Sequence, residues 1–442
     1  MHFLRSLYLH QRFFTTVFLL AAGFLFSYWL PWLYPVLWVL AILLFLLLLA
    51  DIVMLFSPKS ISAERLLSEK FSNSDENPVV INIKSNYGFK VYTEVIDEIP
   101  IQFQKRDFLK ALVIPAGQQI NFEYFLKPVD RGEYFFGNLN IFSSSPLKLA
   151  KKRDRFDRSQ MVKVYPSFIQ MKKYDFMAID QKVAQPGLKK IRKIGHTMEF
   201  EQIRDYVPGD DVRSINWKAT AKQGGLMVNQ YQDERSQPVF SVIDTGRTMK
   251  MPFNGLKLLD YAVNSALAFS NIALRKKDRA GLITFSNKIE KWVSGSSKKT
   301  HLNLLLETLY NVDSRFLDSD YGLLYTHLKK RLPQRSLLLL YTNFEHISAL
   351  RRQLPYLQAI SRKHLLVVIF FENTELESLI TSKAESIPQI FDQTIAEQFS
   401  YDKKLMAREL QKHGIQSILT KPEDLTVNTI NKYLEIKKRG IL

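Results

Sequence analysis

The sequence predicts a multidomain protein with an N-terminal two-helix transmembrane hairpin, a small antiparallel β-sandwich and a C-terminal α/β domain with a parallel sheet. Two long apolar runs occupy the first sixty residues, and after them come short apolar runs separated by turn residues and then apolar runs that alternate with helical spacing. With 442 residues, the chain is long enough for two or three domains. The expected boundaries are 1–60 for the hairpin, 61–170 for the β-sandwich, 171–237 for a basic linker with a charged motif, and 238–442 for the α/β domain.

The composition limits the kinds of chemistry that are open to the chain. An apolar share of 46% with 24% charged residues is typical of globular proteins and argues against a mainly disordered chain. The absence of cysteine excludes disulfides, thiol nucleophiles and thiolate metal sites. Lys and Arg number 61 against 43 Asp and Glu, a formal net charge of +18. This charge suits an anionic partner such as a phospholipid surface, a nucleic acid or an acidic protein.

Two apolar runs predict the membrane hairpin. Residues 13–30 carry no charge, and residues 36–50 are apolar and rich in leucine. A span takes about 20 apolar residues, and Pro31 and Pro35 lie where one helix ends and the next begins. Tyr and Trp gather at this turn, as at a lipid headgroup boundary. Asp51 is expected at the membrane interface, with a proton relay as the alternative.

The flanking charges predict the orientation of the hairpin. Lys and Arg flank both outer ends, whereas the turn has none, so the positive-inside rule places both termini and all soluble domains in the cytoplasm. A cleaved signal peptide is the alternative for the first span. It is disfavoured because a second span follows at once and no small-residue cleavage site is evident.

Short strands with turn residues between them predict the antiparallel β domain. The expected strands are Val79–Ile83, Lys90–Ile96, Ala111–Ile114, Ile120–Leu126, Tyr134–Phe142 and Met161–Tyr165. No ligand-binding constellation occurs here, so the expected role is that of a spacer or docking module. Residues 148–193 then carry fourteen basic residues against four acidic ones. This basic joint fits either an anionic lipid surface or a solvated face.

A charged motif follows the basic joint. Residues 199–206 have apolar residues at helical spacing and predict a short amphipathic helix that ends at a Pro-Gly turn. Asp210 and Asp211 come next, with basic residues and Trp217 close behind. Because clustered charges near an apolar anchor must be paired, we expect an ion-pair network that holds a loop beside a buried Trp217. A pair of carboxylates acting as general acid and base is the alternative.

The run GHTMEFEQIRDYVPGDDVRSINWKATAKQGGLMVNQYQDE, Gly195 to Glu234, resembles the signature of the bacterial domain of unknown function 58 family. Upstream, Tyr124, Pro128, the run Arg131–Tyr134 and the run Val164–Pro166 also resemble that family. The resemblance implies a membrane-anchored protein of the bacterial inner membrane with a von Willebrand factor A-like, Rossmann-like domain. It assigns an interaction or structural role to the signature residues Glu199, Arg204, Tyr206, Pro208, Gly209, Asp210, Asp211, Arg213, Asn216, Trp217 and Lys218.

The residues after 237 predict the α/β domain. Near-continuous apolar strands that alternate with helices indicate a parallel sheet covered on both faces. The expected strands are Pro238–Asp244, Ala280–Phe285, Ser336–Tyr341, His364–Phe371 and Gln416–Leu419, and the expected helices are Leu256–Leu274, His301–Tyr310, one around Asp402–His413 and a closing helix. Ligands of such sheets bind at the carboxyl ends of the strands, where Asp244 lies.

The resemblance implies a cation loop at Asp244. In von Willebrand factor A-like domains an Asp-x-Ser-x-Ser loop helps to hold a divalent cation, and Mg²⁺ prefers such oxygen ligands. Here Gly246 replaces the first Ser and Arg247 adds a positive charge, although Thr248 keeps the second hydroxyl. Asn343 stands where a later Asp is expected, and Ser314 and Ser319 are candidates for the remaining hydroxyl. Asp244, Thr248 and Asn343 are therefore the candidate ligands of a degenerate Mg²⁺ site. The favoured alternative is a metal-free contact surface, and no other cofactor is expected.

The expected function is that of a membrane-anchored interaction or adaptor protein without enzymatic activity. The sequence has no His-Glu-x-x-His, Gly-x-Ser-x-Gly or phosphate-loop motif. The resemblance implies work with a MoxR-type AAA ATPase in envelope or complex assembly, so the expected partners are membrane lipid and this ATPase, with neither nucleic acid nor a small-molecule substrate. One alternative is a metal-dependent hydrolase using Asp210, Asp211 and Asp244. The other is a platform for anionic lipid or nucleic acid at the basic joint.

Overall fold

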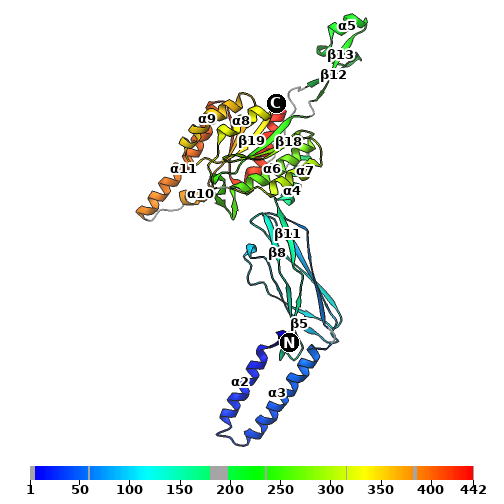
Figure 1. The fold of residues 1–442 in the computed structure, drawn as a ribbon, viewed down its shortest axis with the longest axis vertical. Helices are drawn as coiled ribbons and strands as arrows, with labels where there is room; N and C mark the ends of the chain where they lie inside the picture. Colours follow the sequence, from blue (N-terminus) through cyan, green and yellow to red (C-terminus); the bar gives the residue numbers. More distant parts are fainter. Residues whose placement is uncertain are drawn as a thin grey trace. The chain divides into compact units, whose positions relative to one another are not determined.

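The computed structural model describes residues 5–57, 60–179, 198–233, 236–314, 316–381 and 386–441. The chain divides into two compact units, Met1–Val164 and Tyr165–Leu442 (Figure 1). Residues 180–197, which include the end of the basic joint and the start of the signature run, lie outside the described residues.

The first unit begins with two apolar helices that lie side by side, α2 (Gln11–Phe26) and α3 (Leu33–Leu55) (Figure 1). They meet at small and aromatic residues: a Cβ on Gly23 would lie 2.9 Å from Leu37 Cδ2, and the rings of Phe24 and Trp38 are 5.8 Å apart. Helix α3 has 23 residues and is long and apolar enough to cross a membrane, whereas α2 has 16 residues. By length and composition, one helix in the described residues is therefore a candidate membrane span.

The rest of the first unit is antiparallel β structure. Its strands are β1 (Leu7–Leu9), β2 (Ile61–Leu67), β3 (Lys70–Ser72), β4 (Asn77–Ser85), β5 (Val91–Asp97), β6 (Lys110–Ile114), β7 (Gln119–Leu126), β8 (Gly132–Phe136), β9 (Leu139–Ser144), β10 (Ala150–Phe156) and β11 (Gln160–Tyr165). They form sheets of order β1-β10-β9-β5-β6, β2-β4-β7 and β3-β11-β8. Residues from β2 and β4 share one core with residues from β5, β6 and β9, so two sheets pack face to face. The single strand expected over Tyr134–Phe142 is wrong, because it is interrupted at Gly137 and Asn138 and its two parts, β8 and β9, belong to different sheets.

The helical hairpin is connected to this β structure by the pairing of β1 with β10 and by hydrogen bonds to Asp51. Strand β1 precedes α2 and pairs with β10 in antiparallel register, with Leu7 opposite Lys152. Asp51 of α3 is fully buried, and its Oδ2 accepts the backbone N–H groups of Leu149 at 2.9 Å and Ala150 at 2.8 Å. The carboxylate expected at the membrane interface is thus held by two backbone donors of the β structure at one of its oxygens.

The second unit contains a doubly wound α/β structure. Its six-stranded sheet has the order β18-β17-β14-β19-β20-β21, and all neighbours are parallel except β18. The strands are β14 (Pro238–Asp244), β17 (Arg279–Phe285), β18 (Ile289–Ser296), β19 (Leu337–Tyr341), β20 (Leu365–Phe371) and β21 (Gln416–Thr420). The five strands predicted for this sheet are confirmed. The antiparallel edge strand β18 was not predicted from the sequence.

Helices cover both faces of this sheet. One core joins the sheet to α4 (Phe168–Ile179), α6 (Leu258–Arg275), α7 (His301–Tyr310) and α12 (Leu425–Arg439). The other core joins it to α8 (Tyr321–Arg331), α9 (Ile347–Ser361) and α11 (Ile387–Lys412). A short helix, α10 (Thr374–Thr381), precedes α11. Helix α11 is much longer than the expected Asp402–His413. The prediction missed its first half because this half lies near the surface, where Ile387 is 76% exposed, and its apolar residues lack the periodicity of a core-facing helix.

The signature forms a two-stranded ribbon. Strands β12 (Met198–Asp205) and β13 (Met227–Asp233) pair antiparallel, with the 3₁₀ helix η2 (Val212–Ser214) and helix α5 (Trp217–Gln223) between them. The helix expected over residues 199–206 is therefore wrong. The register contains an extra residue between Phe200 and Gln202, and such a bulge shifts the alternation of a strand by one. Apolar residues three apart, as Phe200 and Ile203 are, can therefore belong to a strand as well as to a helix.

Candidate functional site

The candidate cation-loop residues meet at the carboxyl edge of the parallel sheet. Strand β14 lies at the point where the strand order reverses, between β17 and β19. Asp244 ends β14, Asn343 follows β19, and Thr248 lies in the 3₁₀ helix η3 (Arg247–Lys250). All three line one cleft of about 220 Å³, which we call the Asp244 cleft. Ligands of open α/β sheets bind at such switch points.

Asp244 is buried, and its carboxylate is surrounded by donors of the chain itself. Oδ1 accepts the backbone N–H of Gly246 at 2.8 Å and the hydroxyl of Ser319. Oδ2 accepts the hydroxyls of Thr342 at 2.7 Å and Tyr321 at 3.3 Å. Burial raises the pKa of Asp244, and the hydrogen bonds from Ser319 and Thr342 oppose this rise.

Gly246 and Arg247 have specific places in the loop. A Cβ on Gly246 would lie 2.2 Å from Ser319 Oγ, so a side chain at 246 would displace the Ser319 hydroxyl from its observed position. Ser319, one of the two serines considered for the remaining hydroxyl, lies at Asp244 and donates to it. The exposed Arg247 pairs with Asp318, with Nε 3.0 Å from Oδ1.

The polar groups of the candidate set bond to other groups of the chain. Both oxygens of Asp244 accept hydrogen bonds, and Asn343 Oδ1 accepts a bond of 2.6 Å from the ammonium of Lys403. The described residues contain no group of three or more His, Asp or Glu that could hold a metal. These hydrogen bonds connect the loops after β14 and β19.

The ribbon tip, residues 206–226, is held by side-chain hydrogen bonds to the backbone. Asp210 accepts from the Arg204 guanidinium at 2.7 Å and from the N–H of Val207 at 3.0 Å. The Arg204 hydrogen bond lowers the pKa of Asp210. Asp211 begins η2 by accepting the N–H of Arg213 at 3.0 Å. Part of the expected network is therefore present, although Asp211 bonds to backbone and not to a basic side chain.

Polar capping also fixes the second half of the ribbon tip. Asn216 caps α5 by accepting the N–H of Ala219 at 3.0 Å, and its Nδ2 donates to Asn229 Oδ1 at 2.8 Å. Tyr206 N–H donates to Leu226 O at 2.8 Å. Gly209 has a φ of 111°, which favours glycine in the turn after Pro208. Glu199 lies in β12.

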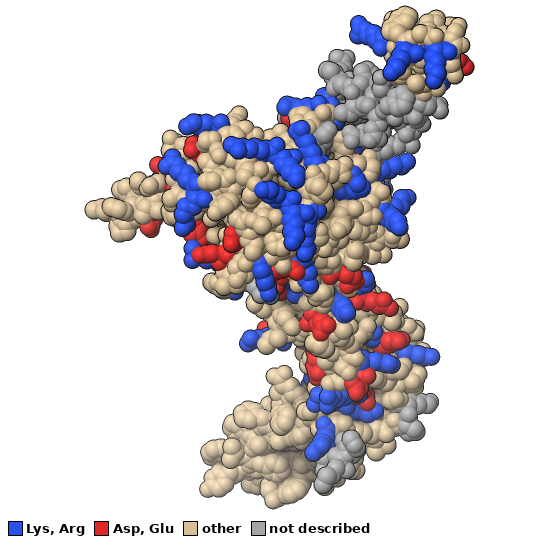
Figure 2. Space-filling model, turned by 45° about the horizontal axis from the view of Figure 1, so that its top comes forward, with Lys and Arg blue, Asp and Glu red and all other residues tan. Residues whose placement is uncertain are grey.

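Trp217 lies on the surface of the ribbon tip. The buried position expected for it is wrong, since 68% of the residue is exposed. Val207, Val212 and Leu226 are also exposed, at 56%, 65% and 47%. The sequence could not distinguish core from surface here, because a two-stranded ribbon has no second layer to cover its apolar side chains. Lys218 and Arg213 are exposed as well, and Figure 2 shows basic side chains gathered on the ribbon.

The basic joint is partly neutralised where the structure describes it. Lys151 Nζ lies 2.7 Å from Glu94 Oε1, and Lys152 Nζ lies 3.2 Å from Asp154 Oδ1. Arg153 donates to Asn140 Oδ1 at 2.8 Å. These contacts favour the solvated, internally paired face for this part of the joint.

Comparisons with known proteins agree with the signature. The family model described as "Protein of unknown function DUF58" matches residues 202–379. "Uncharacterized protein YeaD" of Bacillus subtilis (strain 168) is 27% identical over 204 residues, which are 45% of this chain and 51% of that protein. The chain thus matches about half the length of this curated relative.

Solved structures give weak likenesses. The conserved hypothetical protein BatB from Bacteroides thetaiotaomicron is 11% identical, with a TM-score of 0.32, over 46% of this chain and 99% of that chain. The CARDB domain of the PF1109 protein from Pyrococcus furiosus is 13% identical, with a TM-score of 0.19, over 25% of this chain and 90% of that chain. These scores support no fold assignment. The family match, by contrast, includes the ribbon tip and Asp244, and it supports the resemblance to the DUF58 family over residues 202–379.

Proposed function

We propose that this chain is a membrane-anchored adaptor that binds a protein partner through its ribbon tip. The observation that carries the proposal is the exposure of Trp217 and Val212 on a ribbon tip fixed by capping hydrogen bonds. Exposed apolar groups on a preorganised surface are typical of docking sites, and Trp and Arg are enriched among the residues that dominate binding energy. The Asp244 cleft, whose carboxylate is satisfied internally, is assigned a supporting role.

The partner we propose is a MoxR-type AAA ATPase, with a role in envelope or complex assembly. This follows from the family resemblance, and the basic ribbon tip is suited to an acidic docking surface on such a partner. The alternative hydrolase gains no support from the carboxylates, because Asp210, Asp211 and Asp244 each accept hydrogen bonds that fix local structure.

We further propose that the α/β unit is von Willebrand factor A-like. Its support is the doubly wound strand order with an antiparallel edge strand β18, together with Asp244 at the end of the first strand. The cation loop would then be one in which hydrogen bonds to Asp244 from Ser319 and other hydroxyls of the chain take the place of the metal.

The proposed anchor is a two-pass hairpin with both ends in the cytoplasm. The support is connectivity: the chain enters the hairpin from β1 and returns to β2 in the same unit, so an even number of crossings must lie between them. With 16 residues α2 is about 24 Å long, which a locally thinned bilayer accommodates at modest cost. A cleaved signal would remove β1 from its place beside β10.

The test of the adaptor is co-purification of the full-length chain from membranes. We compare wild type with Trp217→Ser and, as a matched control, Phe391→Ser, which removes an aromatic residue that is 65% exposed on α11. An AAA ATPase retained by wild type and by Phe391→Ser but lost from Trp217→Ser is the expected result. Equal retention by both variants would overturn the proposed dock, provided that circular dichroism gives equal helix and strand content.

A further inference from the structure

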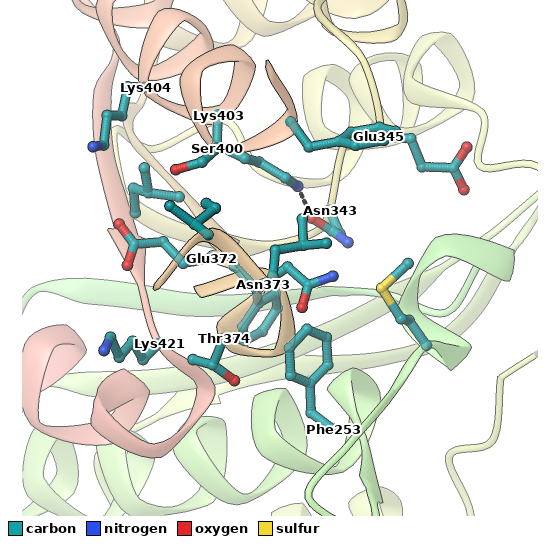
Figure 3. Close-up of a pocket in the computed structure, with 16 residues that line it drawn as sticks. Phe253, Asn343, Glu345, Glu372, Asn373, Thr374, Ser400, Lys403, Lys404 and Lys421 are labelled. Atoms are coloured by element: carbon teal, nitrogen blue, oxygen red, sulfur yellow. Dashed lines mark hydrogen bonds between the residues drawn. The ribbon is translucent and has the colours of Figure 1, made fainter. Parts of the chain in front are cut away.

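A second cavity, of about 320 Å³, opens at the carboxyl edge of the sheet over β19, β20 and β21 (Figure 3). It shares Asn343 and Glu345 with the Asp244 cleft. Much of its wall is apolar, with contributions from Phe253, Phe371, Leu376, Ile380, Phe399 and Leu419. Its size falls at the lower end of small-molecule sites, which occupy roughly 300–1,000 Å³.

Lys403, Lys404 and Lys421 line the cavity together with the carboxylates Glu345 and Glu372, and Lys403 is the lysine that reaches Asn343. Lys403, from α11, donates to Asn343 Oδ1 at 2.6 Å and to Phe344 O at 2.6 Å. Both acceptors are neutral. Figure 3 shows the Glu345 carboxylate turned away from the Lys403 amine, and Glu372 on the other side of the cavity. Within the described part of the chain, no carboxylate forms an ion pair with Lys403.

The ammonium is thus desolvated without a carboxylate in contact, and the nearby charge of Glu345 offsets only part of the effect of burial on the pKa of Lys403. A lysine has three N–H donors, and the two bonds to Asn343 and Phe344 leave one unused. Removing a charge from water costs free energy unless an opposite charge compensates it. Burial accordingly lowers the pKa of Lys403 to about 8. An anion inside the cavity would supply the missing charge and the third acceptor.

We propose that this cavity binds a small carboxylic acid with an apolar body, whose carboxylate pairs with Lys403 and whose body lies against Phe253, Phe371 and Phe399. The Lys403 ammonium, held by two hydrogen bonds in the cavity wall, can pair with one carboxylate, and inorganic phosphate tests whether Lys404 and Lys421 favour an anion of higher charge instead. The apolar wall rewards a ligand that carries hydrocarbon behind its acid group. The site is separate from the ribbon tip, so this proposal and the proposed adaptor function can fail independently.

The experiment is calorimetric titration of the full-length protein in detergent with three probes. They are 3-phenylpropionate, its neutral analogue 3-phenylpropionamide and inorganic phosphate. Wild type should bind 3-phenylpropionate about tenfold or more tightly than the amide, because a hydrogen bond to a charged group contributes roughly 1.5–3 kcal/mol. Equal affinity for acid and amide, preference for phosphate, or no binding of any probe at millimolar concentration overturns the proposal.

Two lysines of the cavity provide the matched variants. Lys403→Met should weaken 3-phenylpropionate about tenfold or more, whereas Lys404→Met, which also lines the cavity but is exposed, should bind like wild type. An equal loss in both variants would indicate non-specific charge attraction and contradict the site.

A measurement on wild type alone keeps the proposal testable if Lys403→Met does not fold. Because only the ammonium form attracts the acid, the affinity for 3-phenylpropionate should fall as pH rises through about 8, while that for the amide stays constant. A carboxylate affinity that does not change between neutral pH and pH values above 8 counts against Lys403 as the anchor.

Discussion

The hydroxyl of Ser319 occupies the space that a side chain on Gly246 would need, and from there it donates a hydrogen bond to Asp244. The two positions are 73 residues apart in sequence, so the loop after β14 and the segment before α8 are fitted to each other. The relationship explains why the hydroxyl pattern expected after Asp244 is broken at 246, since the polar group reaches the carboxylate from another part of the chain.

We predict that Gly246→Ala lowers the free energy of unfolding of the α/β unit by roughly 1–3 kcal/mol, because a methyl group must displace Ser319 from a packed site. In the double variant with Ser319→Ala the loss should be smaller than the sum of the two single losses, since the clash is gone. Hydrogen exchange of the β14 and β19 amides measures this. Gly225→Ala is the control, because nothing lies within 4 Å of its added Cβ. Additive losses would contradict the fit.

From the position of His364 we predict that the α/β unit loses stability in mild acid. It lies just before β20, is 3% exposed, and neither ring nitrogen has a hydrogen-bond partner in the described structure. Burial lowers its pKa from 6.5 to about 4. The folded state therefore stays unprotonated while the unfolded state takes up a proton, and the stability that is present above pH 6.5 is lost as pH falls toward 4.

Between pH 7.5 and pH 5 this histidine should cost about 2 kcal/mol of stability. His364→Leu should remove that part of the pH dependence, whereas His346→Gln, at a more exposed histidine of the same unit, should retain it. Hydrogen exchange of the β20 amides, corrected for intrinsic rates at each pH, gives the comparison. An unchanged pH dependence in His364→Leu would show that another group is responsible.

Strands with continuous burial were predictable from sequence. All seven residues of β14 are buried, so its apolar run, including the acidic end at Asp244, matches the observed bounds. The edge strand β18 was not predictable, because its residues are half-buried or exposed and carry little periodicity. Sequence spacing also failed at the ribbon, where a bulge imitates helical spacing between Phe200 and Ile203.

The site was predictable only in part, because its groups come from distant segments. Asp244 was expected at the carboxyl edge of the sheet from strand order alone. Lys403 gave no signal, since a lysine on an amphipathic helix is normally solvated and only the tertiary structure sets it beside Asn343. Trp217 misled in the opposite direction, because a large aromatic residue among charges is more often covered than exposed.

The pairing of β1 with β10 makes the membrane topology testable by single-cysteine labelling, since the chain contains no cysteine. If the proposed hairpin crosses twice, Trp29→Cys at the turn should react with a membrane-impermeant maleimide in intact cells. Glu64→Cys in β2 and Tyr8→Cys in β1 should react only after the membrane is opened, because both strands belong to the same unit.

Each other outcome selects a different arrangement. Labelling of Glu64→Cys in intact cells would place the soluble units outside and contradict the cytoplasmic orientation. A mature chain from which Tyr8→Cys has been removed by cleavage would contradict the two-pass hairpin. Absence of labelling at all three sites in intact cells, with labelling at all three after opening, would mean that neither helix crosses. If β1 and β2 lie on the same side of the membrane, as we propose, α3 can cross without α2 only when the chain is cut between them. Labelling of Trp29→Cys at the turn therefore tests whether the short helix α2 crosses the membrane together with α3.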